Sequence, residues 1–154
     1  MILAAFALLG CGSGSGGSDS ISTVGSYIGA GDLSEYKPGT PQRTVLQWWK
    51  AVQFGNPSVV HRYYAPGMGP GLHQLQRELA AASNQFSGIP TFNSAEIHKR
   101  TATLYFFVTR PESSTPARPA SINLVTRHGE WGLADDQLLS QVVERVNQAK
   151  PSAG

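Results

Sequence analysis

The chain has 154 residues, which is enough for one domain and too few for two of ordinary size. Charged residues make up only 14% of it and the net charge is +2, without the clustered basic stripe that nucleic-acid binding needs. The charge is uneven: residues 11–40 carry one base against three acids, whereas residues 41–154 carry 11 bases against 7 acids. We therefore expect a mildly basic domain behind a mildly acidic segment, with no nucleic-acid partner.

Residues 1–10 form an uninterrupted apolar run. The run is shorter than the roughly 20 residues of a membrane-spanning helix and fits the apolar region of a signal peptide. The Leu8-Leu9-Gly10-Cys11 segment resembles the lipobox of bacterial lipoprotein precursors, although no Lys or Arg precedes the run. In that family the chain is cut before the cysteine, whose thiol is then lipidated.

The resemblance implies that Cys11, the only cysteine, carries a fatty-acylated anchor. It also implies that the protein lies on the extracytoplasmic face of the cell membrane or outer membrane.

The following segment, residues 11–40, is rich in Gly, Ser and Asp. Its few apolar residues are too sparse for a core, which predicts a flexible tether with a mean reach of roughly 30 Å. The Pro38-Gly39-Thr40-Pro41 segment is typical of a boundary. We therefore expect a signal peptide over residues 1–10, a tether over 11–40 and a domain over 41–150.

The first part of the domain has helical periodicity. Thr40 and Pro41 are suited to the start of a helix, and Val45, Trp48, Trp49 and Val52 then follow at the spacing of one helix face up to Gly55. The Asn56-Pro57 pair repeats this start and predicts a second helix over residues 57–64. A loop over residues 65–71 and a third helix beginning at Leu72 follow, and Gly88-Ile89-Pro90 ends the helical part.

The second part has strand periodicity. Strands are predicted over residues 95–99, 101–110 and 119–127, and a turn at His128-Gly129 leads to a short strand at 131–133. Aromatic residues alternate onto both faces of the 101–110 segment, which predicts a central strand that is covered on both sides. An amphipathic helix over residues 135–150 ends the domain. Helices followed by an antiparallel sheet make an α+β fold.

Three segments resemble the nuclear-transport-factor-2-like (NTF2-like) superfamily: residues 45–57, Tyr63-Tyr64-Ala65-Pro66 and residues 127–133. The resemblance spans about residues 41–134. It implies an NTF2-like cone, in which a curved antiparallel sheet wraps around N-terminal helices. The additional C-terminal helix departs from the commonest pattern of that family, and we expect it to cover the sheet or to pair two copies.

Enzymes of this superfamily work inside the cone, often with Asp and Tyr side chains. Here two aspartates lie in the tether and two lie beyond the last strand, while Glu96 is expected to face solvent. The sequence therefore predicts no catalytic residue. The four histidines are scattered and lack metal-binding spacing, so neither a metal site nor a cofactor is expected.

Aromatic residues at helical and strand spacing usually pack in a core, and we expect this of Trp49, Phe106 and Trp131. Tyr63 and Tyr64 fit either a core or a pocket. The Gly-rich loop after them is suited to frame a pocket opening. The predicted ligand-binding residues are His61, Tyr63, Tyr64 and Met68.

The resulting hypothesis is a lipid-anchored, non-enzymatic NTF2-like domain that binds a small apolar ligand or another envelope protein. Two alternatives remain open. One is an isomerase- or hydrolase-like enzyme with its site in the cone, and the other is a structural module that forms a homodimer.

Overall fold

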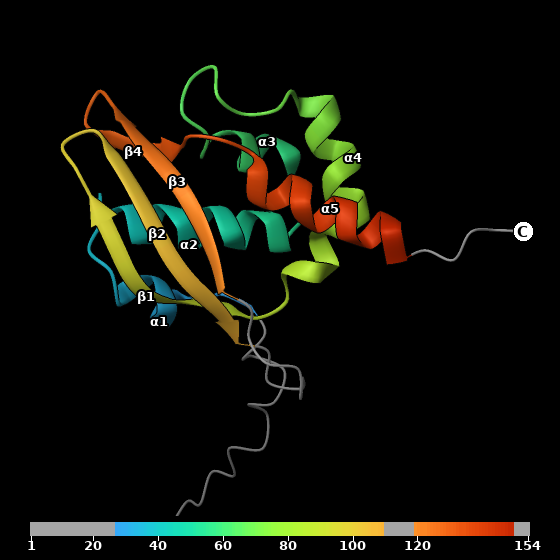
Figure 1. Cartoon of the computed structure of the whole chain (residues 1–154), viewed down its shortest axis with the longest axis horizontal. Helices are drawn as coiled ribbons and strands as arrows, with labels where there is room; N and C mark the ends of the chain where they lie inside the picture. Colours follow the sequence, from blue (N-terminus) through green and yellow to red (C-terminus); the bar gives the residue numbers. More distant parts are fainter. Residues whose placement is uncertain (1–26, 110–118, 150–154) are drawn as a thin grey trace, which may run out of the picture.

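The computed structural model describes residues 27–109 and 119–149, which form an α+β domain with a curved antiparallel sheet. Its helices are α1 (Ala30–Ser34), α2 (Pro41–Gln53), α3 (Pro57–His61), α4 (Leu72–Ala82), the 3-10 helix η2 (Ser83–Phe86) and α5 (Gln137–Ala149). Its strands are β1 (Ile89–Ile97), β2 (Thr101–Thr109), β3 (Pro119–Arg127) and β4 (Glu130–Leu133), in that order across the sheet. In Figure 1, α2 lies behind the sheet and α5 extends away from it beside α4.

The start of α2 follows from local chemistry. The Thr40 hydroxyl accepts a hydrogen bond from the Arg43 backbone N–H, and Pro41 occupies the first helical position, where no N–H is needed. The helix ends before Gly55, whose φ of 63° is one that other residues rarely adopt. Both predicted ends of this helix are confirmed.

Strand β1 begins at Ile89, earlier than the periodicity predicts. Pro90 is tolerated because β1 is an edge strand, so its missing N–H costs no ladder bond. A bulge between Phe92 and Ser94 leaves Asn93 out of the register. The helical part ends before Gly88 as predicted, whereas the strand predicted over residues 95–99 spans Ile89–Ile97.

The hairpin between β3 and β4 is formed as predicted. His128 and Gly129 have φ values of 54° and 83°, the positive pair that a two-residue hairpin turn needs. The turn sets Thr126 opposite Trp131 and Leu124 opposite Leu133. Trp131 is nevertheless only half-buried at the margin of the core, so it is not the fully buried anchor that we expected.

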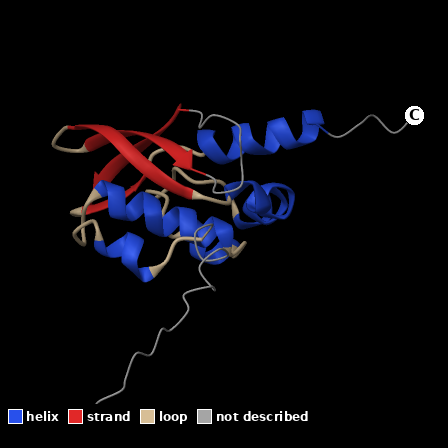
Figure 2. Ribbon diagram, turned by 90° about the horizontal axis from the view of Figure 1, so that it is seen from below, coloured by secondary structure: helices blue, strands red, loops and turns tan. Residues whose placement is uncertain are grey.

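One face of the sheet, here called the inner face, packs against α2. Its residues Ala102, Leu104 and Phe106 are buried, and the Phe106 ring lies 5.9 Å from that of Trp49. Both aromatic residues are core residues, as predicted. The opposite face, here called the outer face, is not overlain by any described helix (Figure 2), and Thr103, Tyr105 and Phe107 on it are only half-buried. The prediction that this strand is covered on both sides is therefore wrong for the described residues.

Residues 27–40 differ from the expected tether. They include α1, and Ile28 is 2% exposed within the core. The Arg43 guanidinium donates hydrogen bonds to the carbonyl oxygens of Leu33 and Tyr36 at 2.8 and 3.0 Å, which holds the end of α1 against α2. The packed domain therefore includes this stretch, while residues 11–26 of the expected tether lie outside the described residues.

The helix predicted over residues 57–64 is shorter than expected and ends at His61. The backbone after it pairs with β4 instead of continuing the helix, as a parallel bridge between Tyr64 and Leu133. Within residues 27–109 and 119–149, no helix has both the length and the apolarity needed to cross a membrane.

Candidate functional site

Tyr64 is held in the interior by the pairing of its neighbours with β4. The Ala65 N–H donates to the Leu133 carbonyl oxygen at 2.9 Å, and the Leu133 N–H donates to the Tyr63 carbonyl oxygen at 2.8 Å. Tyr64 is consequently only 6% exposed. A buried tyrosine hydroxyl needs a hydrogen-bond partner.

That partner is Asp136, which immediately precedes α5. The Tyr64 hydroxyl donates to Asp136 Oδ1, and the Ser140 hydroxyl, one turn into α5, donates to Asp136 Oδ2 at 3.1 Å. Glu78 of α4 faces the same carboxyl group. We call these three residues the Tyr64–Asp136–Glu78 cluster. It joins the turn after α3, helix α4 and the start of α5.

Burial dominates the electrostatics of the cluster. Loss of water raises the pKa of Asp136, the hydrogen bonds from Tyr64 and Ser140 lower it and the nearby Glu78 carboxyl group raises it, and the net result is a pKa of about 6. Burial, followed by the hydrogen bond to Asp136, raises the pKa of Tyr64 well above its ordinary value. Asp136 therefore exchanges its proton near neutral pH, while Tyr64 stays protonated.

Two buried polar atoms, one in the cluster and one beside it, make no hydrogen bond of ordinary geometry among the described residues. They are Oε2 of Glu78 and the indole Nε1 of Trp48, which approaches the Tyr64 hydroxyl. Each such atom costs about 1–3 kcal/mol, so their presence is unusual. A carboxyl group of pKa about 6 beside a tyrosine has the chemistry of a proton donor or acceptor.

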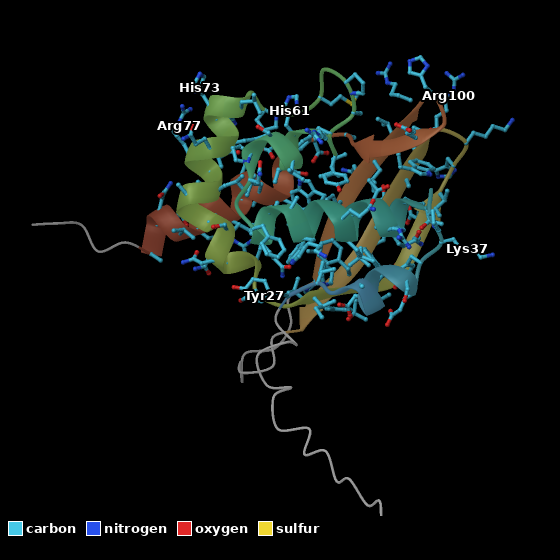
Figure 3. The ribbon with its side chains drawn as sticks, turned by 180° about the vertical axis from the view of Figure 1, so that it is seen from behind. Tyr27, Lys37, His61, His73, Arg77 and Arg100 are labelled. Atoms are coloured by element: carbon cyan, nitrogen blue, oxygen red, sulfur yellow. The ribbon has the colours of Figure 1, made fainter. Side chains whose placement is uncertain are left out.

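The structure brings only one of the predicted ligand-binding residues into this cluster. Tyr64 belongs to it, whereas His61 is exposed on α3 and points away from the interior (Figure 3). Tyr63 and Met68 are half-buried, and Tyr63 packs at the margin of the core. Cys11 lies outside the described residues. Two neighbouring tyrosines were expected to act alike, but the β4 pairing turns only the second one inward.

Asp136 and Glu78 are the residues that sequence reasoning missed. Asp136 lies beyond the last strand, as predicted, but its bond to Tyr64 spans 72 positions and holds it half-buried at the margin of the core. Of the described residues, no three His, Cys, Asp or Glu side chains lie together as a metal site would need.

A second feature lies on the outer face. The Ser94, Tyr105 and Ser121 side chains share one row across β1, β2 and β3. A hollow of about 470 Å³ opens beside them. It is lined by Asn93, Ser94, Glu96, Tyr105, Pro119, Ala120 and Ser121. We call it the outer-face hollow. Its only internal side-chain bond is long, from the Tyr105 hydroxyl to Glu96 Oε1 at 3.4 Å.

Sequence reasoning missed the outer-face hollow, although it placed Glu96 correctly in solvent. The polar residues of β3 alternate with buried apolar ones, which indicates a face without a helix. The sequence around Asn93 has no comparable pattern that would indicate the bulge. The bulge depends on how β1 pairs with β2, and no Gly or Pro at Asn93 signals it.

No family model and no curated protein matches the chain. Among solved structures, a calcium/calmodulin-dependent protein kinase II association domain from Xanthomonas campestris is similar over 65% of this chain and 88% of its own, with 18% identity and a TM-score of 0.35. A protein from Kribbella flavida covers 70% and 95%, with 16% identity and a TM-score of 0.35. A de novo designed protein with a curved β-sheet covers 80% and 100%, with 10% identity and a TM-score of 0.39. Likenesses of this size indicate no activity or ligand for this chain.

Proposed function

We propose that the protein is an extracytoplasmic lipoprotein, held in the cell membrane or outer membrane by lipid on Cys11. Its NTF2-like domain is a non-catalytic binding module. The lipobox-like Leu8-Leu9-Gly10-Cys11 segment after an apolar run supports the anchor. The order of helices before an antiparallel sheet, together with the resemblance in sequence, supports the NTF2-like cone.

The contrast between the two faces of the sheet is the observation that carries the binding role. The inner face packs against α2 in one continuous apolar core, in which Trp49 contacts both Phe86 and Phe106. The outer-face hollow is open, and its volume lies within the range of small-molecule sites. Polar and apolar atoms both line it, and five of its seven lining residues carry a polar side-chain group. The proposed ligand is therefore a polar molecule or a polar segment of an envelope protein, in place of an apolar ligand beside residues 61–71.

Solvent mapping by NMR tests the binding role without a known ligand. Small organic probes such as acetamide and isopropanol should shift the backbone amides of Ser94, Tyr105 and Ser121 together. Tyr105→Ala should weaken this response, and Phe54→Ala, which removes a 66% exposed aromatic ring elsewhere, should leave it intact. Probe shifts scattered over the whole surface would remove the basis for a binding module. Shifts on the outer face that depend on protein concentration alone would favour the dimerising module.

The enzyme alternative is a second candidate because of one observation, the Tyr64–Asp136–Glu78 cluster. A carboxyl group with a pKa of about 6 next to a tyrosine hydroxyl suits isomerase- or hydrolase-like proton transfer. If this candidate holds, the same probes should gather beside Asp136, and Asp136→Asn should abolish their binding there. Probes confined to the outer face would argue against it.

The anchor is tested by labelling cells with a fatty-acid analogue. Wild-type protein should carry the label and enter the detergent phase, because only a thiol forms the thioether to diacylglycerol. Cys11→Ser should be unlabelled and remain uncleaved or soluble. Equal labelling of both proteins would contradict the lipid anchor.

A further inference from the structure

The outer-face hollow has a lining that restricts what it can hold. Among its described lining residues there is one carboxylate, Glu96, and no Lys or Arg side chain, which disfavours an anionic ligand. The remaining polar groups are neutral: the Asn93 amide, the Ser94 and Ser121 hydroxyls and the Tyr105 phenol. A large apolar ligand would leave these groups without partners, at a cost for each of them.

A cationic ligand fits the carboxylate but uses only part of the remaining lining. An ammonium group donates hydrogen bonds and accepts none, so it can bond the amide and hydroxyl oxygens but leaves the Asn93 N–H groups and the hydroxyl protons to other acceptors. A ligand hydroxyl both donates and accepts, which matches every side chain of this set. The mixture of one acceptor-only group with several donor–acceptor groups therefore favours a ligand that carries several hydroxyl groups.

The shape and the aromatic content of the hollow agree with this chemistry. The Tyr105 ring is half-buried at the centre of the row, flanked by Ser94 on β1 and by Ser121 on β3. The face of an aromatic ring carries partial negative charge and attracts polarised C–H groups such as those on one side of a sugar ring. The bulge leaves Asn93 without a paired residue on β2, and the Asn93 side-chain amide lines the hollow.

We propose that the outer-face hollow binds a neutral saccharide, which stacks on Tyr105 while its hydroxyl groups bond Glu96, Asn93 and the two serines. This inference rests on the proposed binding function and gives its ligand class. The hollow is shallow and open to solvent. It therefore suits a short stretch of an oligosaccharide better than a fully enclosed monosaccharide. The expected affinity is modest, with a Kd on the order of 1 mM.

Titration of the folded protein with chitotriose, cellotriose and maltotriose, followed through backbone amide shifts, tests the inference. At least one of the three should give saturable shifts at Ser94, Tyr105 and Ser121. Tyr105→Ala should raise its Kd by about tenfold, whereas Tyr105→Phe, which keeps the ring, should change it by less than about threefold. Glu96→Gln keeps the hydrogen-bonding shape and should also cost less than about threefold. Phe54→Ala should have no effect.

Trilysine serves as the competing cationic probe. Binding of trilysine that Glu96→Gln abolishes, with no response to any sugar, would overturn the saccharide assignment in favour of a cationic ligand. Absence of saturable shifts with all three sugars also overturns it. If organic probes still gather at the hollow in that case, the binding function stands and only the ligand class fails. If neither sugars nor organic probes gather there, both proposals fail.

Discussion

The glycine at position 132 lets β4 approach the backbone of residues 64–65 closely. Gly132 of β4 is buried, and a Cβ added to it would lie 2.7 Å from the Ala65 nitrogen and 2.9 Å from the Ala65 Cα. Both atoms belong to the backbone and cannot swing aside as a side-chain end would. The close approach of β4 to residues 64–65, and therefore the bond from Tyr64 to Asp136, depends on glycine at this position.

Gly132→Ala should therefore lower the free energy of unfolding by about 1–3 kcal/mol, because the two backbones must move apart. Gly31→Ala is the matched control, since a Cβ there meets no atom within 4 Å and lies in helix α1. It should leave stability unchanged or raise it slightly. Urea denaturation of both variants measures the difference. Equal stability of the two would show that β4 and residues 64–65 separate easily.

Residue-level prediction from sequence succeeded where the signal is local. The Thr40 cap and the His128-Gly129 turn were predicted because cap and turn chemistry acts within a few positions. Asp136 was missed for the opposite reason. Its burial depends on a partner 72 positions away, which no local pattern encodes.

At the scale of elements, α5 is attached to the domain by two kinds of contact. Leu139 is its only fully buried residue within the described range, and Leu138, Val142 and Val143 pack at the margin of the core. The polar contact is made at its start, where Asp136 meets Tyr64 of the turn after α3 and Glu78 of α4. The protonation of Asp136 therefore affects how firmly α5 is held.

Stability should decrease as pH rises through the range between about 4 and 6. The folded state binds the Asp136 proton more tightly than the unfolded chain does, because burial raises its pKa from 3.8 to about 6. The favourable contribution is complete below about pH 4 and lost above the folded pKa. Thermal unfolding of Asp136→Asn, which is neutral throughout, should lack this decrease. Asp135→Asn removes a charge one residue earlier and should still show the decrease in stability with pH. If stability is independent of pH in both variants, the decrease does not come from Asp136.

The position of α1 makes a separate prediction about the start of the domain. Ile28→Ala should cost about 2–5 kcal/mol, because the Ile28 side chain is 2% exposed within the core. Tyr27→Ala changes a 52% exposed neighbour and should cost well under half as much. If both variants lose equally little stability in chemical denaturation, residues 27–40 do not pack on the domain and belong to the tether.

The sequence predicted α2, β2 and β3 well, β1 only in part and the short α1 not at all. Helix α2 has apolar residues at regular helical spacing, whereas Ile28, Leu33 and Tyr36 are separated by Gly, Asp, Ser and Glu. Five residues are too few for an isolated helix to be stable. The Arg43 bonds and the contact between Tyr36 and Phe92 supply the tertiary support that composition does not reveal.

At the scale of the whole molecule, the N-terminal side of the described chain and the hairpin turns lie apart. Tyr27 and Arg100 are on opposite sides of the domain in Figure 3. The β1–β2 turn lies beside the β3–β4 turn, since the Thr126 N–H donates to the Arg100 carbonyl oxygen at 2.9 Å. If the chain is anchored through Cys11, the hairpin turns lie on the side of the described domain away from Tyr27, its first described residue.

The single cysteine allows this arrangement to be tested in cells. A lipidated Cys11 has no free thiol, so wild-type protein should not react with a small membrane-impermeant maleimide. Lys99→Cys places a thiol in the exposed β1–β2 turn and should react in intact cells, because an extracytoplasmic domain is open to the reagent. Ile122→Cys, at a position 3% exposed, should react only after denaturation. Reaction of Lys99→Cys only after lysis would place the domain inside the cell and contradict the proposed location, whatever the state of the lipid anchor.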